Sequence, residues 1–483
     1  MLRRLGGCIL LLGVLLSALY WHVEGGLLVY ESRLEAGLVD VLNVGPDAWV
    51  IVVIALCIIP AILGIMGGIA LFESLSILAK ILSRTGYNIE PLTGVMLLER
   101  GLWMMLAVYG VIALLIASMY GALKLLSPLV QAKSINRVLA WAKGFVEPLT
   151  TNTRWDGNWY LNTAILIIIL SILLPHTRIF NPSMSIVSTD TLFNLKYIND
   201  FREDGFLHGF KNNIGALRPL YLIFIYIVWK LSPIPEVVLF DVVLPTIGLM
   251  ILSLSVYYLS QILNVPNPGA ATLFSMLYWT PFFVIGGFHT NLYGLSMGLV
   301  AYARYLKGDT IGTSVLLFML SLWHPWTLIY ILAGMTLFSL SNRSFRSLYA
   351  SLSASLLGLA LLLALLYVTG KPSHIGNLVN TMTPSKPVGK LSFILYVYLW
   401  SSVARPEILV PGSISLIARD TPLIYLIIPS LGFILLSPVP AFRLLMIAPI
   451  PLALGYLRKE VAFPMLFPAI ASWTHLILNA PPI

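Results

Sequence analysis

Charged residues are scarce in this chain of 483 residues, because only 10% are Asp, Glu, Lys or Arg. Soluble globular domains carry about 25%, so the composition excludes an ordinary soluble protein. Cysteine is nearly absent as well: Cys8 and Cys57 each lie in an apolar run, which predicts neither a disulfide framework nor a metal site. No basic run carries interleaved aromatic residues, so the net charge of +9 does not indicate a nucleic-acid partner.

Apolar residues make up 58% of the chain. They gather in continuous runs of roughly 17 to 25 residues, which are long enough to cross a bilayer. Continuous runs predict helices, whereas a transmembrane β-barrel requires alternation and is excluded. The predicted fold class is therefore all-α, a polytopic transmembrane helical bundle in an integral protein of the plasma membrane, surrounded by membrane lipids. The first run, 2–21, lacks a good cleavage site and is interpreted as an uncleaved span.

About fourteen spans are predicted from the hydrophobic pattern. After the first run they lie at residues 48–72, 101–126, 159–175, 237–263, 269–286, 290–306, 311–322, 325–340, 347–369, 391–403, 422–437, 441–457 and 461–479. Short connections such as 264–268 and 437–440 predict that consecutive helices are antiparallel neighbours. We divide the chain into N-terminal accessory transmembrane segments, 1–150, and a main transmembrane domain, 151–483.

Basic residues in short loops set the orientation, because cytoplasmic loops carry an excess of Lys and Arg. The loops predicted to be cytoplasmic contain Lys133, Arg137, Lys143, Arg154, Arg304, Lys307, Arg343, Arg346, Arg405, Arg419, Arg458 and Lys459. This places residues 176–236, 289–291, 323–326 and 370–390 on the outer face. All of these loops fall on the predicted sides only if the apolar segment 217–231 lies along the membrane and does not cross it. The first 150 residues fit the rule less well, and a helix at 75–82 is either a further crossing or an interfacial segment.

A polar stretch, Ser188-Thr189-Asp190-Thr191, interrupts the apolar sequence on the predicted outer face. After it, apolar residues recur at every third position from 192 to 201 and predict an amphipathic surface helix. Asp190 begins this helix, where backbone N–H groups favour a carboxylate. Two interpretations stay open: Asp190 is a helix cap, or it is the carboxylate of an active site at the membrane surface.

Residues 155–480 resemble the GT-C superfamily of polyprenyl-phosphate-sugar-dependent glycosyltransferases. The resemblance rests on Asp190 opening a surface helix, on Gly205, on Arg218-Pro219-Leu220-Tyr221 and on the run at 244–248. It implies juxtamembrane helices in the first large outer loop, which agrees with the charge argument for 217–231.

The resemblance further implies that 151–483 is a catalytic domain and that Asp190 is its catalytic residue. The expected reaction moves a sugar, with inversion, from a polyprenyl-phosphate donor to an acceptor hydroxyl on the non-cytoplasmic face. The chain has Asp190-Thr191 where many members have an Asp-Glu pair, and it has no clear Asp-x-Asp. No metal ligand is therefore predicted, and a divalent cation stays open as a cofactor.

Such a reaction needs a base for the acceptor hydroxyl and a positive charge for the leaving phosphate. Arg218 is the first choice for the positive charge, because it stands at the head of the juxtamembrane segment. An arginine that reaches lipid headgroups is the ordinary alternative. Lys386 is a second substrate-binding candidate, and it lies in an outer loop with Lys371 and Lys390.

Three further substrate-binding candidates, His289, Asn291 and His324, lie at the ends of predicted outer turns. His324 stands in Trp323-His324-Pro325-Trp326, where an interfacial aromatic belt is the ordinary explanation. No short spacing joins the two histidines, so a zinc site is not predicted.

Asp156 is the alternative catalytic residue. Its segment, Arg154-Trp155-Asp156-Gly157-Asn158-Trp159-Tyr160, resembles the Trp-Asp element of the glycosylphosphatidylinositol mannosyltransferase branch of the same superfamily. That assignment requires the opposite topology, and a plain interfacial anchor is the competing interpretation.

Two other functions stay open. A transporter or lipid flippase would place ionisable residues inside the membrane, yet Asp241, the one acid well inside a predicted span, stands near that span's outer end. A non-catalytic scaffold is the third possibility, in which the N-terminal spans pack against a membrane protein partner.

Overall fold

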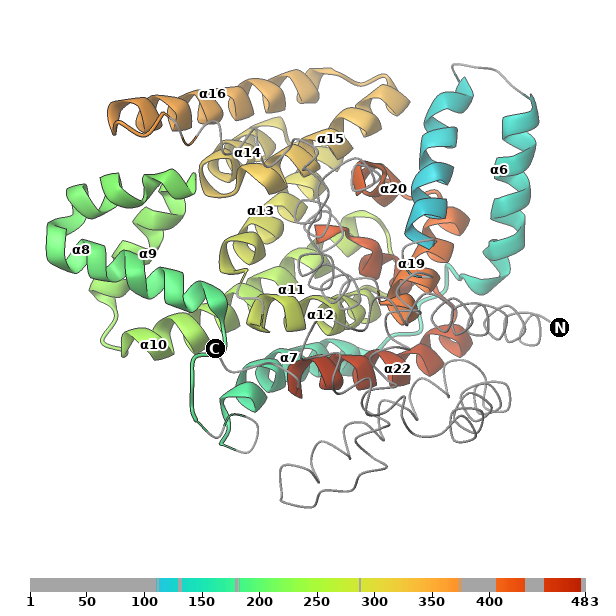
Figure 1. Cartoon of the computed structure of the whole chain (residues 1–483). Coiled ribbons are helices and arrows are strands. Elements are labelled where there is room, and N and C mark those ends of the chain that lie inside the picture. Colours follow the sequence, from blue (N-terminus) through green and yellow to red (C-terminus); the bar gives the residue numbers. More distant parts are fainter. Residues whose placement is uncertain are drawn as a thin grey trace, which may run out of the picture.

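The computed structural model describes residues 110, 113–128, 133–178, 181, 183–285, 288–372, 374, 405–430 and 447–478. Within these ranges the regular structure is helical, and extended backbone pairs only at a single bridge between Thr150 and Leu457. The all-α prediction is confirmed for this part of the chain (Figure 1). The spans predicted at 2–21, 48–72 and 391–403 lie outside the described residues.

The described helices follow one another along the chain with short connections. They are Ala113–Pro128, α6 (Lys133–Val146), α7 (Asn158–Leu173), α8 (Thr189–Asn213), α9 (Pro219–Leu231), α10 (Glu236–Val238), α11 (Leu244–Ile262), α12 (Pro268–Ile285), α13 (His289–Leu306), α14 (Thr310–Trp323), α15 (Pro325–Asn342), α16 (Arg346–Val368), α19 (Pro406–Arg419), α20 (Leu423–Ile427) and α22 (Lys459–Leu478). Tighter 3₁₀ turns occur at η2 (Glu147–Leu149), η3 (Leu174–His176), η4 (Ile214–Ala216) and η7 (Ile450–Tyr456), and η5 (Leu239–Val243) is a π-helix.

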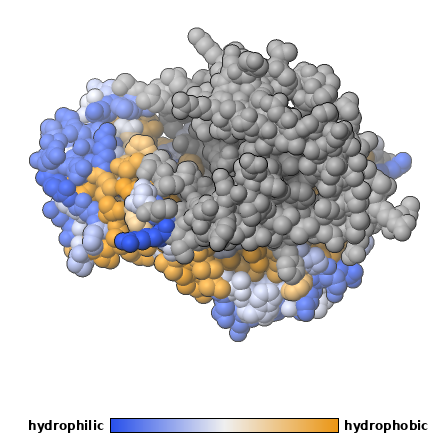
Figure 2. All heavy atoms as spheres, turned by 60° about the horizontal axis from the view of Figure 1, so that its bottom comes forward, coloured by the Kyte–Doolittle hydropathy of each residue, from blue (hydrophilic) through white to orange (hydrophobic). Residues whose placement is uncertain are grey.

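Three described stretches, Asn158–His176, Glu236–Ile262 and Arg346–Val368, are long and apolar enough to cross a membrane. At 1.5 Å per residue they extend roughly 28, 40 and 34 Å, against about 30 Å of hydrocarbon. Many of their side chains are apolar and exposed, among them Ile165, Leu166, Ile169, Ile247, Ile251, Leu254, Leu356, Leu357 and Leu361. Figure 2 shows hydrophobic surface between a hydrophilic end at the left and a hydrophilic patch at the lower right. This pattern is typical of a membrane protein.

The segment predicted to lie along the membrane, 217–231, forms α9. With 13 residues, α9 is roughly 20 Å long, which is too short to cross a bilayer. Its buried residues Tyr221, Leu222 and Ile225 pack in a cluster with Ile198 and Phe201 of α8. A helix is present where the sequence predicted one after Asp190: α8, which is kinked at Gly205, packs with α9 at one end of the bundle (Figure 1).

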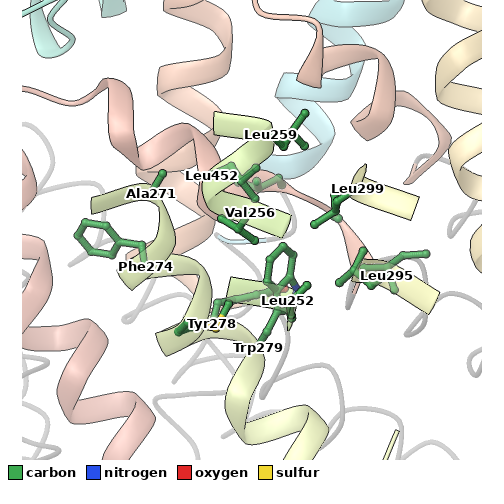
Figure 3. Close-up of a cluster of buried hydrophobic side chains, with 14 of the residues drawn as sticks. Leu252, Val256, Leu259, Ala271, Phe274, Tyr278, Trp279, Leu295, Leu299 and Leu452 are labelled. Atoms are coloured by element: carbon green, nitrogen blue, oxygen red, sulfur yellow. The ribbon is translucent and has the colours of Figure 1, made fainter. Parts of the chain in front are cut away.

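The core lies where α11 packs against both α12 and α13 (Figure 3). Leu252, Val256 and Leu259 of α11 belong to one hydrophobic cluster with Tyr278 and Trp279 of α12, and all five side chains are fully buried. Helices α14 and α16 approach each other closely at a glycine. A Cβ atom on Gly358 of α16 would overlap the hydroxyl of Ser321 in α14. Glycine at this crossing therefore lets the two backbones touch.

Arg405 was predicted to lie in a cytoplasmic loop, and this prediction is wrong because its side chain is fully buried. Its Nη1 donates a hydrogen bond of 2.6 Å to the carbonyl oxygen of Leu277 in α12. That carbonyl lacks an intrahelical donor, because the residue four positions later, Pro281, has no N–H. Arg405 also pairs with Glu407 at 2.8 Å. Residues 406–419 then form the helix α19 instead of the predicted loop.

Two predicted spans near the C-terminus also differ from the structure. Within the span predicted at 441–457, residues 450–456 form the 3₁₀ helix η7, which begins between Pro449 and Pro451. Proline removes the N–H donors on which an α-helix depends. Within the span predicted at 422–437, the described residues form the short helix α20 and a further 3₁₀ turn through residue 430. The remaining residues of both spans lie outside the described part of the chain.

Candidate functional site

Asp190 lies between the N-termini of two helices. It is in the first turn of α8, whose N-cap residue is Ser188. Its Oδ2 accepts a hydrogen bond of 2.9 Å from the backbone N–H of His289, the first residue of α13. Helix N-termini favour negative charge, because their first N–H groups lack intrahelical acceptors. Asp190 therefore caps α13, whereas the sequence predicted that it would cap the helix it begins, α8. Its side chain is only half-buried.

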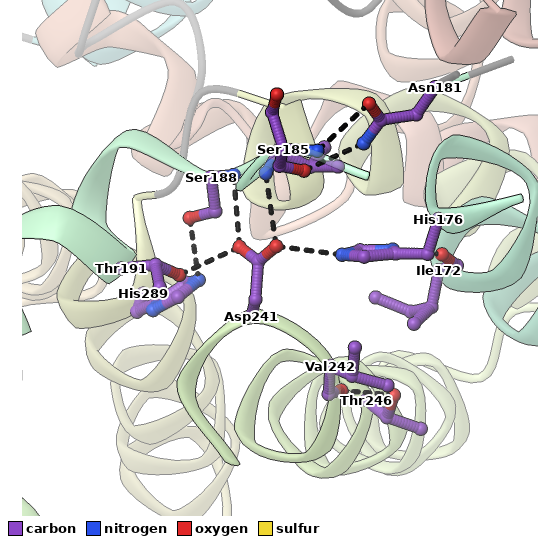
Figure 4. Close-up of polar contacts among 11 residues, drawn as sticks. Ile172, His176, Asn181, Ser185, Ser188, Thr191, Asp241, Val242, Thr246 and His289 are labelled. Atoms are coloured by element: carbon purple, nitrogen blue, oxygen red, sulfur yellow. Dashed lines mark hydrogen bonds and ion pairs between the residues drawn. The ribbon is translucent and has the colours of Figure 1, made fainter. Parts of the chain in front are cut away.

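The turn that leads to Asp190 is held in place by a second carboxylate, Asp241, which is buried (Figure 4). Its Oδ1 accepts from the backbone N–H of Ser188 at 3.0 Å and from Thr191 Oγ1 at 2.8 Å. Its Oδ2 accepts from the backbone N–H of Val187 at 3.0 Å and lies 2.8 Å from His176 Nε2. Asp241 thus joins the end of the α7 segment to the start of α8.

Asp241 itself sits in the π-helix η5, between α10 and α11. A π-helical turn inserts an extra residue into the helix and is frequently found at functional sites. The sequence analysis noted Asp241 as an acid inside an apolar span but assigned it no role. An acid at such a position is a signal for a buried polar partner, and here that partner is the turn that carries Asp190.

His289 belongs to a chain of buried hydrogen bonds next to Asp190. Tyr221 donates from its hydroxyl to Asn194 Oδ1 at 3.0 Å, which leaves Asn194 Nδ2 to donate to His289 Nδ1 at 3.3 Å. With Nδ1 as acceptor, the neutral ring carries its proton on Nε2 and donates it to Ser188 Oγ at 3.1 Å. The predicted substrate ligand His289 therefore orients the Asp190 turn from within the protein.

Arg218 and Asp190 both act electrostatically on the phenol of Tyr197 in α8. The pKa of the Tyr197 phenol is raised mainly by burial; the charge of Arg218 lowers it, and the charges of Asp190 and Asp200 raise it. The phenol is therefore within electrostatic range of both Arg218 and Asp190. Within the described residues, the guanidinium of Arg218 makes no hydrogen bond or ion pair, and it stays partly exposed.

Two further basic residues approach this region from the end of α16. The His374 ring packs against the backbone of Gly215, where a Cβ atom would lie 2.7 Å from its Cε1. Gly215 stands three residues before Arg218, and Lys371 stands three residues before His374. The sequence analysis named Lys371 but missed His374. Lys386 and Lys390 lie outside the described residues, so their predicted role stays a prediction.

Apolar side chains are exposed around the Asp190 turn. Met184 precedes it, and Leu192 and Phe193 follow directly on α8, all three exposed. The predicted stripe of α8 is thus only partly correct, because Leu192 lies outside while Ile198 and Phe201 are buried. Exposed apolar residues beside a carboxylate are what a site at the level of a membrane surface would present.

The other two predicted substrate ligands, Asn291 and His324, are buried. Nδ2 of Asn291, in the first turn of α13, has no acceptor among the described residues. His324 accepts from the backbone N–H of Thr327 through its Nδ1 at 3.2 Å and so caps α15. Trp323 is also buried, in ring contact with Tyr221, and it is not an interfacial belt residue as the alternative interpretation held.

Asp156, the alternative catalytic residue, lies at the other end of α7 and is buried. Its Oδ2 accepts from the backbone N–H groups of Gly269 at 2.7 Å and Ala270 at 3.2 Å, in the first turn of α12. Its Oδ1 pairs with Arg154 at 3.2 Å. Asp156 therefore acts as an anion at a helix N-terminus. Roughly 24 Å of helix separates it from the Asp190 end of α7, so the structure does not bring the two aspartates together.

The described residues contain no group of three His, Cys, Asp or Glu side chains arranged to hold a metal ion, and a divalent cation stays open as a cofactor. No protein-family model, no curated protein and no solved structure matches this chain.

Proposed function

We propose that this protein is an integral membrane glycosyltransferase of the GT-C type, with about fourteen spans in the plasma membrane. It transfers a sugar from a polyprenyl-phosphate donor to an acceptor hydroxyl on the non-cytoplasmic face. The observation that carries the proposal is the site of Asp190: a partly exposed carboxylate at two helix N-termini, which shares the electrostatic environment of Tyr197 with Arg218, an arginine without a hydrogen bond or ion pair among the described residues.

Asp190 acts as the general base in this proposal. The carboxylate takes the proton of the acceptor hydroxyl while the acceptor oxygen bonds to the anomeric carbon of the donor sugar. A carboxylate offers about four lone-pair positions, and the backbone N–H of His289 occupies one of them. That bond and the anchoring of the turn by Asp241 fix the direction of the carboxylate, which is the pre-organisation that catalysis requires.

The leaving group is the polyprenyl phosphate, which departs as the bond between the anomeric carbon and the phosphate oxygen breaks. Negative charge develops on that oxygen and requires a positive partner. Arg218 can donate two parallel hydrogen bonds to a phosphate, and its guanidinium is not engaged elsewhere in the described chain. His374 and Lys371, at the end of α16, supply further positive charge or donors on the same side.

The lipid chain of the donor fits the exposed apolar residues around the site. Met184, Leu192 and Phe193 lie next to Asp190 along the chain, so a polyprenyl tail in the membrane can contact them while its phosphate reaches Arg218. Contacts of this kind contribute about 25 cal/mol per Å² of apolar surface removed from water.

A transporter is the second candidate, and one observation favours it. Arg405 and Glu407 form a fully buried ion pair between α12 and α22, and Glu407 Oε2 has no partner among the described residues. Ionisable groups deep inside a membrane protein often mark an ion or substrate path. The scaffold interpretation, in which residues 1–150 bind a membrane protein partner, rests on no contact in the described residues.

The proposal is tested in membranes that express the protein, with labelled sugar on crude polyprenyl-phosphate donors. We expect Asp190→Asn to abolish transfer and the matched variant Asp204→Asn, an exposed acid later in α8, to retain it. Asp156→Asn is expected to lose folded protein but not the activity per folded molecule. Transfer that survives in Asp190→Asn but disappears from folded Asp156→Asn would instead support the inverted topology. Solute uptake without sugar transfer would support the carrier.

A further inference from the structure

Helix α6 has a wide apolar side of which only one part packs against the protein. Leu139, Ala142 and Val146 turn inwards and join a cluster with Tyr120 and Ile417. This cluster fixes α6 against α19 and against the helix Ala113–Pro128. It accounts for one half of the apolar surface of α6.

The other half is exposed. Val138, Trp141 and Phe145 have 54%, 73% and 58% of their side-chain surface open. The rings of Trp141 and Phe145 stack with their centroids 6.0 Å apart. At about 100° per residue, these three side chains fall within an arc of roughly 60°, directly beside the arc that packs inwards. The exposed stripe is therefore continuous with the buried one.

The opposite side of α6 carries small, polar and basic residues. Arg137 and Ala140 are exposed there, and Lys143 is partly exposed and paired with Asp420 at 3.4 Å. The helix itself contains no acidic residue. A continuous apolar arc opposite a basic arc is the pattern of a helix that lies in the surface of a membrane.

The position of α6 agrees with this pattern. Figure 1 shows α6 upright at the right-hand end of the bundle, whereas α7 and α22 run across the view. The chain passes from α6 through η2 to Trp155 and Trp159 at the start of α7. Tryptophans at the end of a span mark the level of the lipid headgroups, and α6 therefore lies near that level.

We infer that α6 is a membrane-surface helix, which inserts Val138, Trp141 and Phe145 into the leaflet at this end and places Arg137 beside anionic phospholipid headgroups. A protein partner would instead cover the stripe and exclude lipid, and the following experiment separates the two.

The test labels single cysteines in the full chain with a polarity-sensitive fluorophore, after Cys8→Ser and Cys57→Ser. One variant is Trp141→Cys, in the exposed stripe, and the matched control is Ala140→Cys, on the polar side. Both are reconstituted in vesicles of phosphatidylglycerol and phosphatidylcholine. We expect a nitroxide-bearing lipid to quench the label at 141 strongly and aqueous iodide to quench it several-fold less than the label at 140. Iodide quenching at 141, or protection from both quenchers, overturns the inference.

The lipid charge is tested in the same system. The blue shift of the label at 141 is expected to be larger in vesicles that contain phosphatidylglycerol than in pure phosphatidylcholine. Arg137→Gln is expected to reduce that difference, because it removes one positive charge from the basic side. An identical shift in both vesicle types would refute the preference for anionic headgroups. Arg137→Gln does not touch the inward cluster, so loss of folding does not confuse the result.

Discussion

Replacing Asp241 with asparagine tests the anchoring of the Asp190 turn. Both ring nitrogens of His176 face acceptor oxygens: Nδ1 lies 2.6 Å from the carbonyl of Ile172, and Nε2 lies 2.8 Å from Asp241 Oδ2. Only the imidazolium donates from both nitrogens, so the geometry favours a buried ion pair between His176 and Asp241. Asparagine has the same shape as aspartate but no charge.

The cost follows from the four bonds that Asp241 accepts. Asparagine can keep its oxygen towards Ser188 and Thr191 and can donate its Nδ2 to a neutral His176. The backbone N–H of Val187 then faces a donor instead of an acceptor and stays unsatisfied. An unsatisfied buried donor costs about 1–3 kcal/mol, and loss of a charge-assisted bond costs about 1.5–3 kcal/mol. We therefore expect Asp241→Asn to lower the free energy of unfolding by about 3–5 kcal/mol.

The measurement combines the thermal unfolding midpoint in detergent with amide hydrogen exchange across residues 183–191. We expect Asp241→Asn to lower the midpoint and to speed exchange at Val187 and Ser188. The control is Asp309→Asn, which removes the charge of a partly exposed cap at the start of α14 but leaves an oxygen that can accept the capping hydrogen bond, and it is expected to leave exchange at Val187 and Ser188 unchanged. Unchanged exchange at these two amides in a folded Asp241→Asn protein would refute the anchoring.

Three further predictions concern the packing and the loops. Arg405→Met leaves Glu407 buried without its partner and is expected to lower the free energy of unfolding by about 3–5 kcal/mol. Adding Glu407→Gln is expected to restore part of this stability. The thermal unfolding midpoints of the single and double variants measure both effects. Gly358→Ala forces α16 away from Ser321 and is expected to lower the free energy of unfolding by about 1–3 kcal/mol. Adding Ser321→Ala is expected to restore part of that stability in the same assay. The pKa of Asp309 is lowered from its ordinary value of 3.8, first by a backbone hydrogen bond in α14 and then by a nearby arginine. The ionised Asp309 therefore contributes to stability above about pH 3.8, and this contribution is lost as the pH falls through the lower pKa of the folded state. When the thermal unfolding midpoint is measured from about pH 6 to about pH 3, it should fall less for Asp309→Asn than for the wild type.

The long apolar runs predicted most of the described fold. The spans predicted at 159–175, 237–263 and 347–369 agree with α7, the α10–α11 stretch and α16 within one or two residues, because a continuous run must satisfy its backbone in a helix. The prediction that 217–231 does not cross came from counting loop charges, and α9 has a length that agrees with it.

Contacts between distant residues could not be predicted in the same way. The burial of Arg405 could not be predicted from loop charges, because its acceptor, the carbonyl oxygen of Leu277, is 128 residues away in the sequence. That carbonyl lacks an intrahelical donor because α12 contains Pro281. Asp190 was assigned to the N-terminus of α8, but it accepts a hydrogen bond from the backbone N–H of His289 in α13, 99 residues later. Asp241 was visible as an acid in an apolar span, yet nothing in the sequence showed that it holds the turn at Ser188. These pairings depend on which helix ends meet in the bundle.

Transfer of labelled sugar by purified protein in vesicles tests the proposed function most directly. The donor is a polyprenyl-phosphate sugar, and the variants are Asp190→Asn and Asp204→Asn, each confirmed to unfold at the wild-type midpoint. The account predicts that Asp190→Asn lowers the transfer rate by about 10²–10⁴-fold, whereas Asp204→Asn transfers at the wild-type rate. A folded Asp190→Asn protein that transfers sugar as fast as the wild type would contradict the account.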